Sequence, residues 1–378
     1  MSLRATVSQY WQTFQHGLFP WLAEELGPLS ERNKRLVQVL ELVRVEDWLP
    51  DQWAGGRGRP QENRAALARA FLAKAVFDVP TTRALVERLG HDPQLRRLCG
   101  WERAGELPSE ATFSRAFAEF AASELPGQLH AALVERNLEG HLAGHVSRDS
   151  TAIPGREEPA RKPKPIKVKR KRGRPRKGEE RAAEPRRLER QGSMTLEEML
   201  ADLPTVCDVG VKRNAKGHQE SWTGYKLHID AIDGGLPVSC LLTSASLHDS
   251  QAALPLAKLT AGRVDNLYDL MDSAYDAEEI RACSRKLGHV PLIDSNPRRD
   301  AHKKAELKRE ALAQRNIGQA TPQALRYHER STVERVNGRL KDEFGGRHVR
   351  VRGHAKVLCH LMFGIVALTV DQLMRLTL

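Results

Sequence analysis

The 378-residue chain has few of the features that mark secreted or zinc-binding proteins. Its five cysteines are scattered, and no two of them form a Cys-x-x-Cys pair. This spacing gives no support to a zinc site and argues against a disulfide framework. The N-terminus also lacks a charged segment followed by an apolar one, so we expect a cytoplasmic rather than an exported protein.

Long hydrophobic runs are also scarce. The most apolar run, Val357 to Val370, contains His360 and is followed directly by Asp371. It is too short and too polar to span a bilayer. We therefore expect a buried helix near the C-terminus and no membrane partner.

Positive charge is concentrated in one segment. The net charge is +12, and residues 161–177 contain eleven Lys or Arg and no acid. Because 12 − 11 leaves about +1 for the remainder, the basicity is local. Such a distribution predicts a nucleic-acid-binding arm rather than a uniformly basic fold.

Within this arm, an Arg-Gly-Arg-Pro core with basic flanks resembles an AT-hook, a peptide that lies extended in the minor groove of A·T-rich DNA. The candidate DNA contacts are Lys171, Arg172, Arg174, Arg176 and Lys177. The alternative is a non-specific basic tether that binds phosphates through counterion release. The wider segment, about 155–200, is rich in Pro, Lys, Arg and Glu, so we expect it to be disordered in the free protein.

Residues 1–140 read as helical. Apolar stripes at 36–43 and 65–77 have helical spacing, and further helices are predicted to open at Pro80 and Pro108. Short helices joined by tight turns suit a helix-turn-helix-like DNA-binding domain. Arg115 would then lie near the start of a recognition helix. An ordinary helical bundle that supports the core or forms a dimer remains the alternative.

Residues 141–378 differ from the first 140 because strands as well as helices are predicted in them. This pattern predicts an α/β (α+β) domain with a mixed sheet. The expected helices are 251–259 and 277–287. β-Branched and aromatic enrichment predicts strands at 145–153, 222–232, 237–246, 267–272 and 290–293.

Two carboxylates occupy the later parts of predicted strands. Asp149 and Asp272 each follow apolar residues, where an unpaired carboxylate is costly to bury. Acids on adjacent strands can hold Mg²⁺, which prefers oxygen ligands, and two such ions can promote attack on a phosphodiester. Asp269 is the alternative to Asp272, although we expect it to be a surface or pairing residue. Asp249 is expected to cap a helix or to support the site.

The third acid is Glu334. At roughly 100° per residue, Tyr327 and Lys341 lie about 20° from its helical meridian and Arg330 lies about 40° away. The four side chains would therefore share one helix face, on which cations can bind DNA phosphates beside a metal-bound carboxylate. A solvated face of mixed charge is the alternative.

The order Tyr327, Arg330, Glu334 and Lys341 resembles the Tyr-Arg-Glu-Lys signature of bacterial insertion-sequence transposases with a DDE core. Asp149 in its Arg-Asp-Ser-Thr context resembles the first Asp of that family. Asp272, followed by Ala-Tyr-Asp, resembles the second. The interval between them, 272 − 149 = 123 residues, contains the basic segment as an insertion.

The resemblance implies an RNase H-like catalytic domain that uses Mg²⁺ or Mn²⁺, here two ions held by Asp149, Asp272 and Glu334. It implies double-stranded DNA as partner, both terminal inverted repeats and target DNA, with strand cleavage followed by strand transfer. It also implies a homodimer or higher assembly on DNA, in the bacterial cytoplasm and associated with the nucleoid.

Two other functions compete with an active transposase. The chain could be a non-catalytic DNA-binding repressor or architectural protein, or a nuclease on the same fold that cuts without joining strands. The helical region and the basic arm would serve any of the three. Three acids placed near DNA phosphates favour the catalytic functions, because a pure DNA binder has no need of them.

Overall fold

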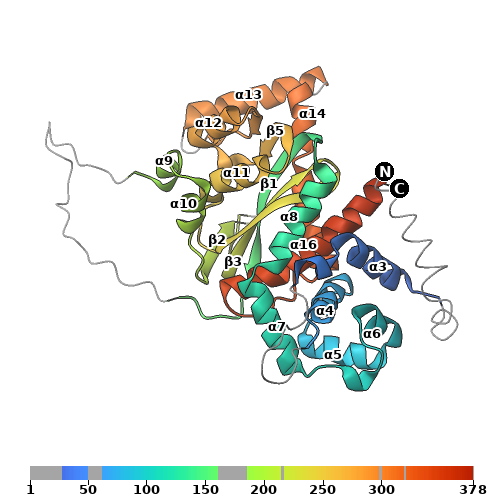
Figure 1. The fold of residues 1–378 in the computed structure, drawn as a ribbon. Helices are drawn as coiled ribbons and strands as arrows, with labels where there is room; N and C mark the ends of the chain where they lie inside the picture. Colours follow the sequence, from blue (N-terminus) through green and yellow to red (C-terminus); the bar gives the residue numbers. More distant parts are fainter. Residues whose placement is uncertain are drawn as a thin grey trace, which may run out of the picture.

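The structure is a computed structural model that describes residues 28–49, 62–160, 185–213, 217–297, 300–318 and 321–377. The basic segment 161–177, with its AT-hook-like core, lies outside the described residues. The predicted combination of helices and a mixed sheet is confirmed (Figure 1).

The described residues of the first half of the chain are helical, as predicted. The helices among them are α3 (Glu31–Val43), η2 (Val45–Trp48), α4 (Arg64–Val76), α5 (Thr82–His91), α6 (Pro93–Cys99), η3 (Ala104–Glu106), α7 (Glu110–Ala122) and α8 (Leu125–Leu138). Short polar side chains start several of them: Ser30, Asn63 and Thr81 each accept a hydrogen bond from a backbone N–H of the first turn. The breaks between helices are thus encoded locally.

The second half is built on one six-stranded sheet. Its strands are β1 (Leu142–Pro154), β2 (Asp208–Arg213), β3 (Gln219–Ile232), β4 (Leu236–Ser244), β5 (Asp265–Met271) and β6 (Val290–Ile293). β1 lies between β3, to which it is antiparallel, and β5, to which it is parallel; β6 pairs with β5. β2 and β4 pair with the first and second halves of β3. This is an RNase H-like mixed sheet.

Helices complete the second half of the chain. They are η4 (Asp233–Gly235), η5 (Asp249–Ala252), α11 (Ala253–Ala261), η6 (Ser273–Tyr275), α12 (Glu278–Lys286), α13 (Ala301–Ile317), α14 (Pro322–His328), α15 (Ser331–Glu343) and α16 (His354–Thr377). α15 packs on β1 and β3. Its buried face carries Val333, Val336 and Leu340. That packing positions the polar residues of α15 over β1.

α16 connects the two halves of the molecule. It contacts α3, α4, α7 and α8 as well as β4 and α15, and one hydrophobic core runs through all of them. Phe363 of α16 stacks on Phe71 of α4, with ring centroids 5.7 Å apart. The predicted buried helix at 357–370 is confirmed. Although α16 is long and apolar enough to cross a membrane, 83% of its most apolar window is buried inside the protein, as in a core helix.

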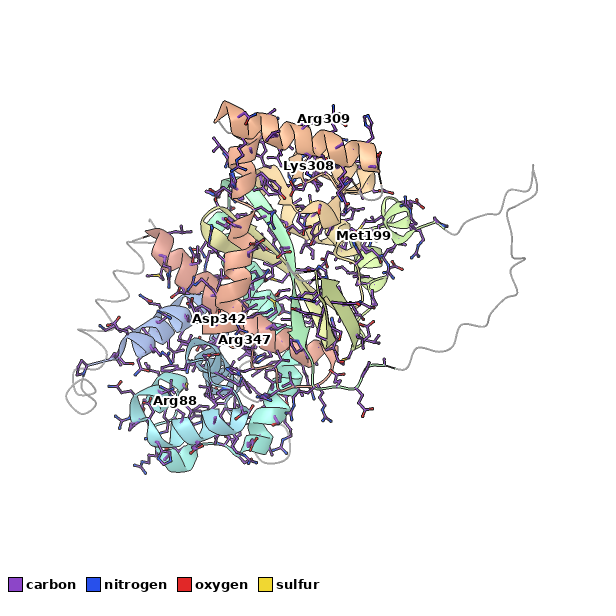
Figure 2. All side chains as sticks on the ribbon, turned by 180° about the vertical axis from the view of Figure 1, so that it is seen from behind. Arg88, Met199, Lys308, Arg309, Asp342 and Arg347 are labelled. Atoms are coloured by element: carbon purple, nitrogen blue, oxygen red, sulfur yellow. The ribbon has the colours of Figure 1, made fainter. Side chains whose placement is uncertain are left out.

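Two local predictions were wrong. The helix expected to run from Tyr327 to Lys341 is broken, because α14 ends at His328 and α15 begins at Ser331. The segment 155–200, expected to lack structure, contains α9 (Arg187–Gln191) and α10 (Leu196–Ala201). Met199 of α10 is fully buried against residues around the end of β5 (Figure 2). The end of the insertion is therefore part of the folded second half of the chain.

Candidate active site

Asp149 lies in the later half of β1, half-buried against α15. Its carboxylate accepts a hydrogen bond from Asn337 Nδ2 at 3.4 Å. Burial raises the pKa of Asp149 from 3.8 to about 7, with further upward contributions from the charges of Asp272, Asp249 and Glu334. Asp149 is therefore hard to ionise mainly because it is buried, and the nearby acids add to that cost.

Asp272 follows the last residue of β5. Because Ser147 pairs with Leu270 in the parallel β1–β5 ladder, Asp149 and Asp272, each two residues further on, lie at the same level of the sheet. Asp272 caps η6 by accepting the N–H of Ala274 at 2.9 Å. Burial raises its pKa, and Asp249 and Asp294 raise it further, whereas the Ala274 N–H and Arg330 lower it.

Glu334 lies on the first turn of α15, and its side chain is 50% exposed. The same helix brings two further polar groups onto β1. Asn337, three residues on, reaches Asp149, and Lys341 Nζ donates to Thr151 Oγ1 at 2.6 Å. Positions three and seven residues apart share a helix face. α15 therefore lies with Asn337 and Lys341 against Asp149 and Thr151, two residues of β1 whose side chains point to the same face of the sheet.

Arg330 and Tyr327 precede this helix instead of sharing it. Arg330 Nη1 pairs with Glu334 Oε1 at 2.8 Å, and its guanidinium lies 5.8 Å from the ring centroid of Tyr327. Tyr327 Oη donates to the carbonyl oxygen of Met271 at 3.3 Å. Burial and the neighbouring Asp294 raise the pKa of Tyr327. Tyr327 thus contacts the end of β5, Arg330 links it to Glu334, and Lys341 contacts β1, although a turn separates the first two residues from α15.

Asp249, which was expected to cap a helix or to support the site, contributes to the site's charge. His248, not Asp249, caps η5, and Asp249 forms an ion pair of 2.8 Å with Lys226 of β3. Although burial opposes it, Lys226 and His228 hold the pKa of Asp249 below its usual value. Asp249 is therefore a carboxylate that stays ionised beside Asp149 and Asp272.

Tyr275 escaped the sequence analysis. It is 1% exposed, and its hydroxyl has no hydrogen-bond partner among the described residues. Burial raises its pKa well above the usual value, and the charges of Asp249 and Asp149 add to the shift. A buried hydroxyl facing these acids is an open donor at the edge of the site.

Arg148, next to Asp149, points to the opposite face of the sheet. Its Nε and Nη2 donate to Asp230 of β3 at 2.8 and 2.6 Å, and Thr260 of α11 donates to the same carboxylate at 2.6 Å. Although burial opposes it, Asp230 holds the pKa of Arg148 above its usual value. This bidentate pair joins β1 to β3 directly beneath Asp149.

The other acids weighed from the sequence have structural partners. Asp269 is not at the surface: it is 2% exposed and accepts hydrogen bonds from Asn266 at 3.1 Å and His289 at 3.3 Å. Asp276, which follows η6, pairs with Arg281 at 2.9 Å and accepts the N–H of Asn296 at 2.8 Å. Arg115 is exposed on α7 and donates to Thr112 at 3.2 Å.

The donor set suits a hard divalent cation in kind. It consists of carboxylates; burial raises the pKa of Asp149 and the neighbouring acids add to the shift, and a cation would favour its ionised form. Its arrangement is incomplete: among the described residues, no three His, Cys, Asp or Glu side chains converge closely enough to hold a metal ion. Glu334 forms an ion pair with Arg330 in this structure.

Comparison with known protein families agrees with this geometry. The family model described as a transposase DDE domain matches residues 144–370, and a second, described as a transposase domain (DUF772), matches residues 23–119. No curated protein and no solved structure matches the chain. The first match spans more than half of the chain and contains Asp149, Asp272 and Glu334. The chain therefore belongs to the DDE transposases of insertion sequences.

Proposed function

We propose that this protein binds the terminal inverted repeats of an insertion sequence, cleaves a DNA strand at the element end, and transfers that end to target DNA. The observation that carries the proposal is geometric: Asp149 and Asp272 lie at the same level of neighbouring strands, beside helix α15, which carries Glu334 and presents Lys341. Such an acid cluster repels DNA unless cations accompany the phosphates. The proposed substrate and the proposed cofactor therefore support each other.

In this proposal, Asp149, Asp272 and Glu334 hold two Mg²⁺ ions, for which Mn²⁺ can substitute. When bound, the ions activate the attacking oxygen and stabilise the leaving oxygen of the phosphodiester. Water attacks at the element end and leaves a free 3′-OH, and this hydroxyl then attacks a target phosphodiester in line.

The cations of the site position DNA. Lys341 lies on the Asp149 side and binds a phosphate as a point charge, and Arg330 can hold one bidentately. Arg330 is released for this role when Glu334 turns towards the other acids, so its present ion pair of 2.8 Å is exchanged for a phosphate. Tyr327, anchored on the Met271 carbonyl, orients the flanking strand.

DNA outside the site contacts the rest of the chain. We propose that the helical first half binds the inverted repeat, with Arg115 at the exposed start of α7, and that the basic segment 161–177 adds phosphate or minor-groove contacts. Transfer of two ends to one target requires a homodimer or a higher assembly on DNA.

The test is a cleavage and strand-transfer assay on the inverted-repeat DNA that flanks the gene, with Mg²⁺. Asp272→Asn should lower the rate by several orders of magnitude, because the site loses one of its oxygen ligands. Asp265→Asn is the matched control, since Asp265 is exposed at the opposite end of β5. Tight binding without cleavage by the unaltered protein, in Mg²⁺ or Mn²⁺, would favour the non-catalytic function instead.

A second pair of variants tests the role of α15. Glu334→Gln should abolish cleavage, whereas Asp342→Asn, an exposed acid eight residues along the same helix, should leave it intact (Figure 2). Cleavage that persists in Glu334→Gln with Mg²⁺ present would remove Glu334 from the site. Cleavage at random positions without strand joining would indicate a nuclease.

A further inference from the structure

A basic cleft lies between the helical first half of the chain and the second half, and Asp149, Asp272 and Glu334 do not line it. It has a volume of about 410 Å³ and is walled by α4, the start of α5, α7, the segment after β1, and residues 348–351. Four cationic side chains line it: Lys74, Arg83, Arg156 and Arg350. These four residues come from both halves of the chain, so the cleft exists only because the two halves pack together.

Lys74 is the most informative residue of the cleft. It is only 8% exposed, and no hydrogen bond or ion pair engages its ammonium group among the described residues. Burial lowers its pKa to about 8, with Asp78 as an opposing influence. A buried cation without a close partner is costly, so its presence here is better explained by a ligand than by stability.

The surrounding groups are suited to an anion. α5 begins at Thr82 in the wall of the cleft, so the positive end of its helix dipole adds positive potential there. Arg156 and Arg350 are exposed, and Arg156 Nη1 donates to the Arg350 carbonyl at 3.4 Å. The one acid that lines the cleft, Glu110, is 3.4 Å from Arg83.

We propose that this cleft binds a backbone phosphate of the inverted-repeat DNA and so connects the helical half to the cleavage site; the proposal rests on the proposed function. Position supports it, because Arg156 follows β1, the strand that carries Asp149. Seven residues at about 3.3 Å each span at most about 23 Å. At 3.4 Å per base pair, the bound phosphate lies within about seven base pairs of the cleaved bond.

The first experiment measures the affinity of the full chain for inverted-repeat DNA against salt concentration, together with thermal stability. Lys74→Met should weaken binding about tenfold and reduce the salt slope by about one. Its melting temperature should equal or exceed that of the unaltered protein, because a buried charge is removed. Unchanged affinity, or lost affinity with a lower melting temperature, would overturn the proposal by making Lys74 a purely structural residue.

A second experiment locates the phosphate. Single uncharged methylphosphonate linkages are placed at successive positions of the same DNA, and the affinity of each duplex is measured. One position within about seven base pairs of the cleavage site should weaken binding by the unaltered protein but not by Arg83→Ala/Arg350→Ala. Lys308→Ala, on α13 at the opposite end of the molecule from α5, is the control and should keep the sensitivity (Figure 2).

The outcomes separate this proposal from the proposed function. If the unaltered protein binds and cleaves DNA but no phosphate position depends on the cleft, the cleft proposal alone is overturned. If the unaltered protein does not bind the DNA at all, both fail together.

Discussion

The two faces of β1 treat charge in opposite ways. On one face, Arg148 and Asp230 form a buried bidentate pair with Thr260 as a third partner. On the other, one residue along the chain, burial raises the pKa of Asp149 to about 7, and the neighbouring acids contribute to the shift. The first face is electrostatically complete within the chain. The second leaves a carboxylate that is hard to ionise, and we propose that this carboxylate serves the reaction whereas the pair on the first face holds the fold.

The largest effect on stability is expected from breaking the complete face. Arg148→Met should lower the free energy of unfolding by about 3–5 kcal/mol, because it leaves Asp230 buried, charged and unpaired. Urea denaturation measures the loss. The double variant Arg148→Met/Asp230→Leu should recover most of it, since two apolar side chains replace the pair. A single variant as stable as the parent would show that the pair does not bear on the fold.

On the face of β1 that carries Asp149, removing the charge should increase stability instead of lowering it. The folded-state pKa of Asp149 lies above its unfolded value of 3.8, so the folded protein binds more protons between 3.8 and about 7, and stability falls as the pH rises through that range. At about 1.4 kcal/mol per pH unit, the cost above pH 7 is on the order of 4 kcal/mol.

Asp149→Asn should remove this cost. Without divalent metal at pH 8, the variant should be more stable than the parent by a few kcal/mol. The two proteins should approach each other in stability near pH 4, because the carboxyl is then protonated in the folded chain and about two-fifths protonated in the unfolded chain, so little of the cost remains. Urea denaturation across pH 4–8 makes the measurement, and parallel stability profiles for the two proteins would contradict the assignment.

A divalent cation should restore the balance of the acidic face. Millimolar Mg²⁺ should raise the melting temperature of the parent, because a ligand that binds only the folded state stabilises it by mass action, by about 2.7 kcal/mol at a hundredfold excess over Kd. Asp149→Asn should respond weakly and Asp342→Asn normally. An equal response of all three would place the stabilising ion elsewhere.

The smallest effect is expected at Tyr275. Its buried hydroxyl has no partner among the described residues, so Tyr275→Phe should change the free energy of unfolding by less than about 1 kcal/mol. The cleavage rate, measured alongside, shows whether the hydroxyl serves the site. A loss of several kcal/mol in stability would reveal a structural role for this hydroxyl.

The sequence predicted the central strands because they are encoded by their own composition. β1, β3 and β4 are buried along much of their length, so their apolar and β-branched residues show clearly. β2 was missed because it is stabilised mainly by pairing with β3. Its residues Val209 and Val211 are exposed, and only six residues form the strand.

The errors in helix prediction have separate causes. Neither Gly nor Pro stands between Tyr327 and Ser331, so the helical spacing predicted one unbroken helix. The structure has a turn there, at which Ser147 of β1 donates to the Glu329 carbonyl at 3.1 Å. The helix α10 was missed because the polar composition of the surrounding segment predicted disorder, although the sequence contains a helix-start signal. Thr195 and Glu198 form a reciprocal capping box at its start.

For the candidate site, the spacing of residues in the sequence predicted only which side chains share a helix face. Helical periodicity placed Glu334 and Lys341 on one face, and the same periodicity would have included Asn337, three residues after Glu334. The pairing of Asp249 with Lys226 joins residues 23 positions apart through the sheet, since 249 − 226 = 23. No pattern in the sequence fixes such a long-range contact.

The most direct test of the acidic face as a metal site is to count Mn²⁺ ions by electron paramagnetic resonance. The sample is the complex with inverted-repeat DNA already cleaved at its 3′ end, so that no cleavage perturbs the measurement. The unaltered protein should bind about two Mn²⁺ ions per active site, and Asp149→Asn should lose them while still binding the DNA. Equal Mn²⁺ binding by both proteins would contradict the assignment of Asp149 as a metal ligand.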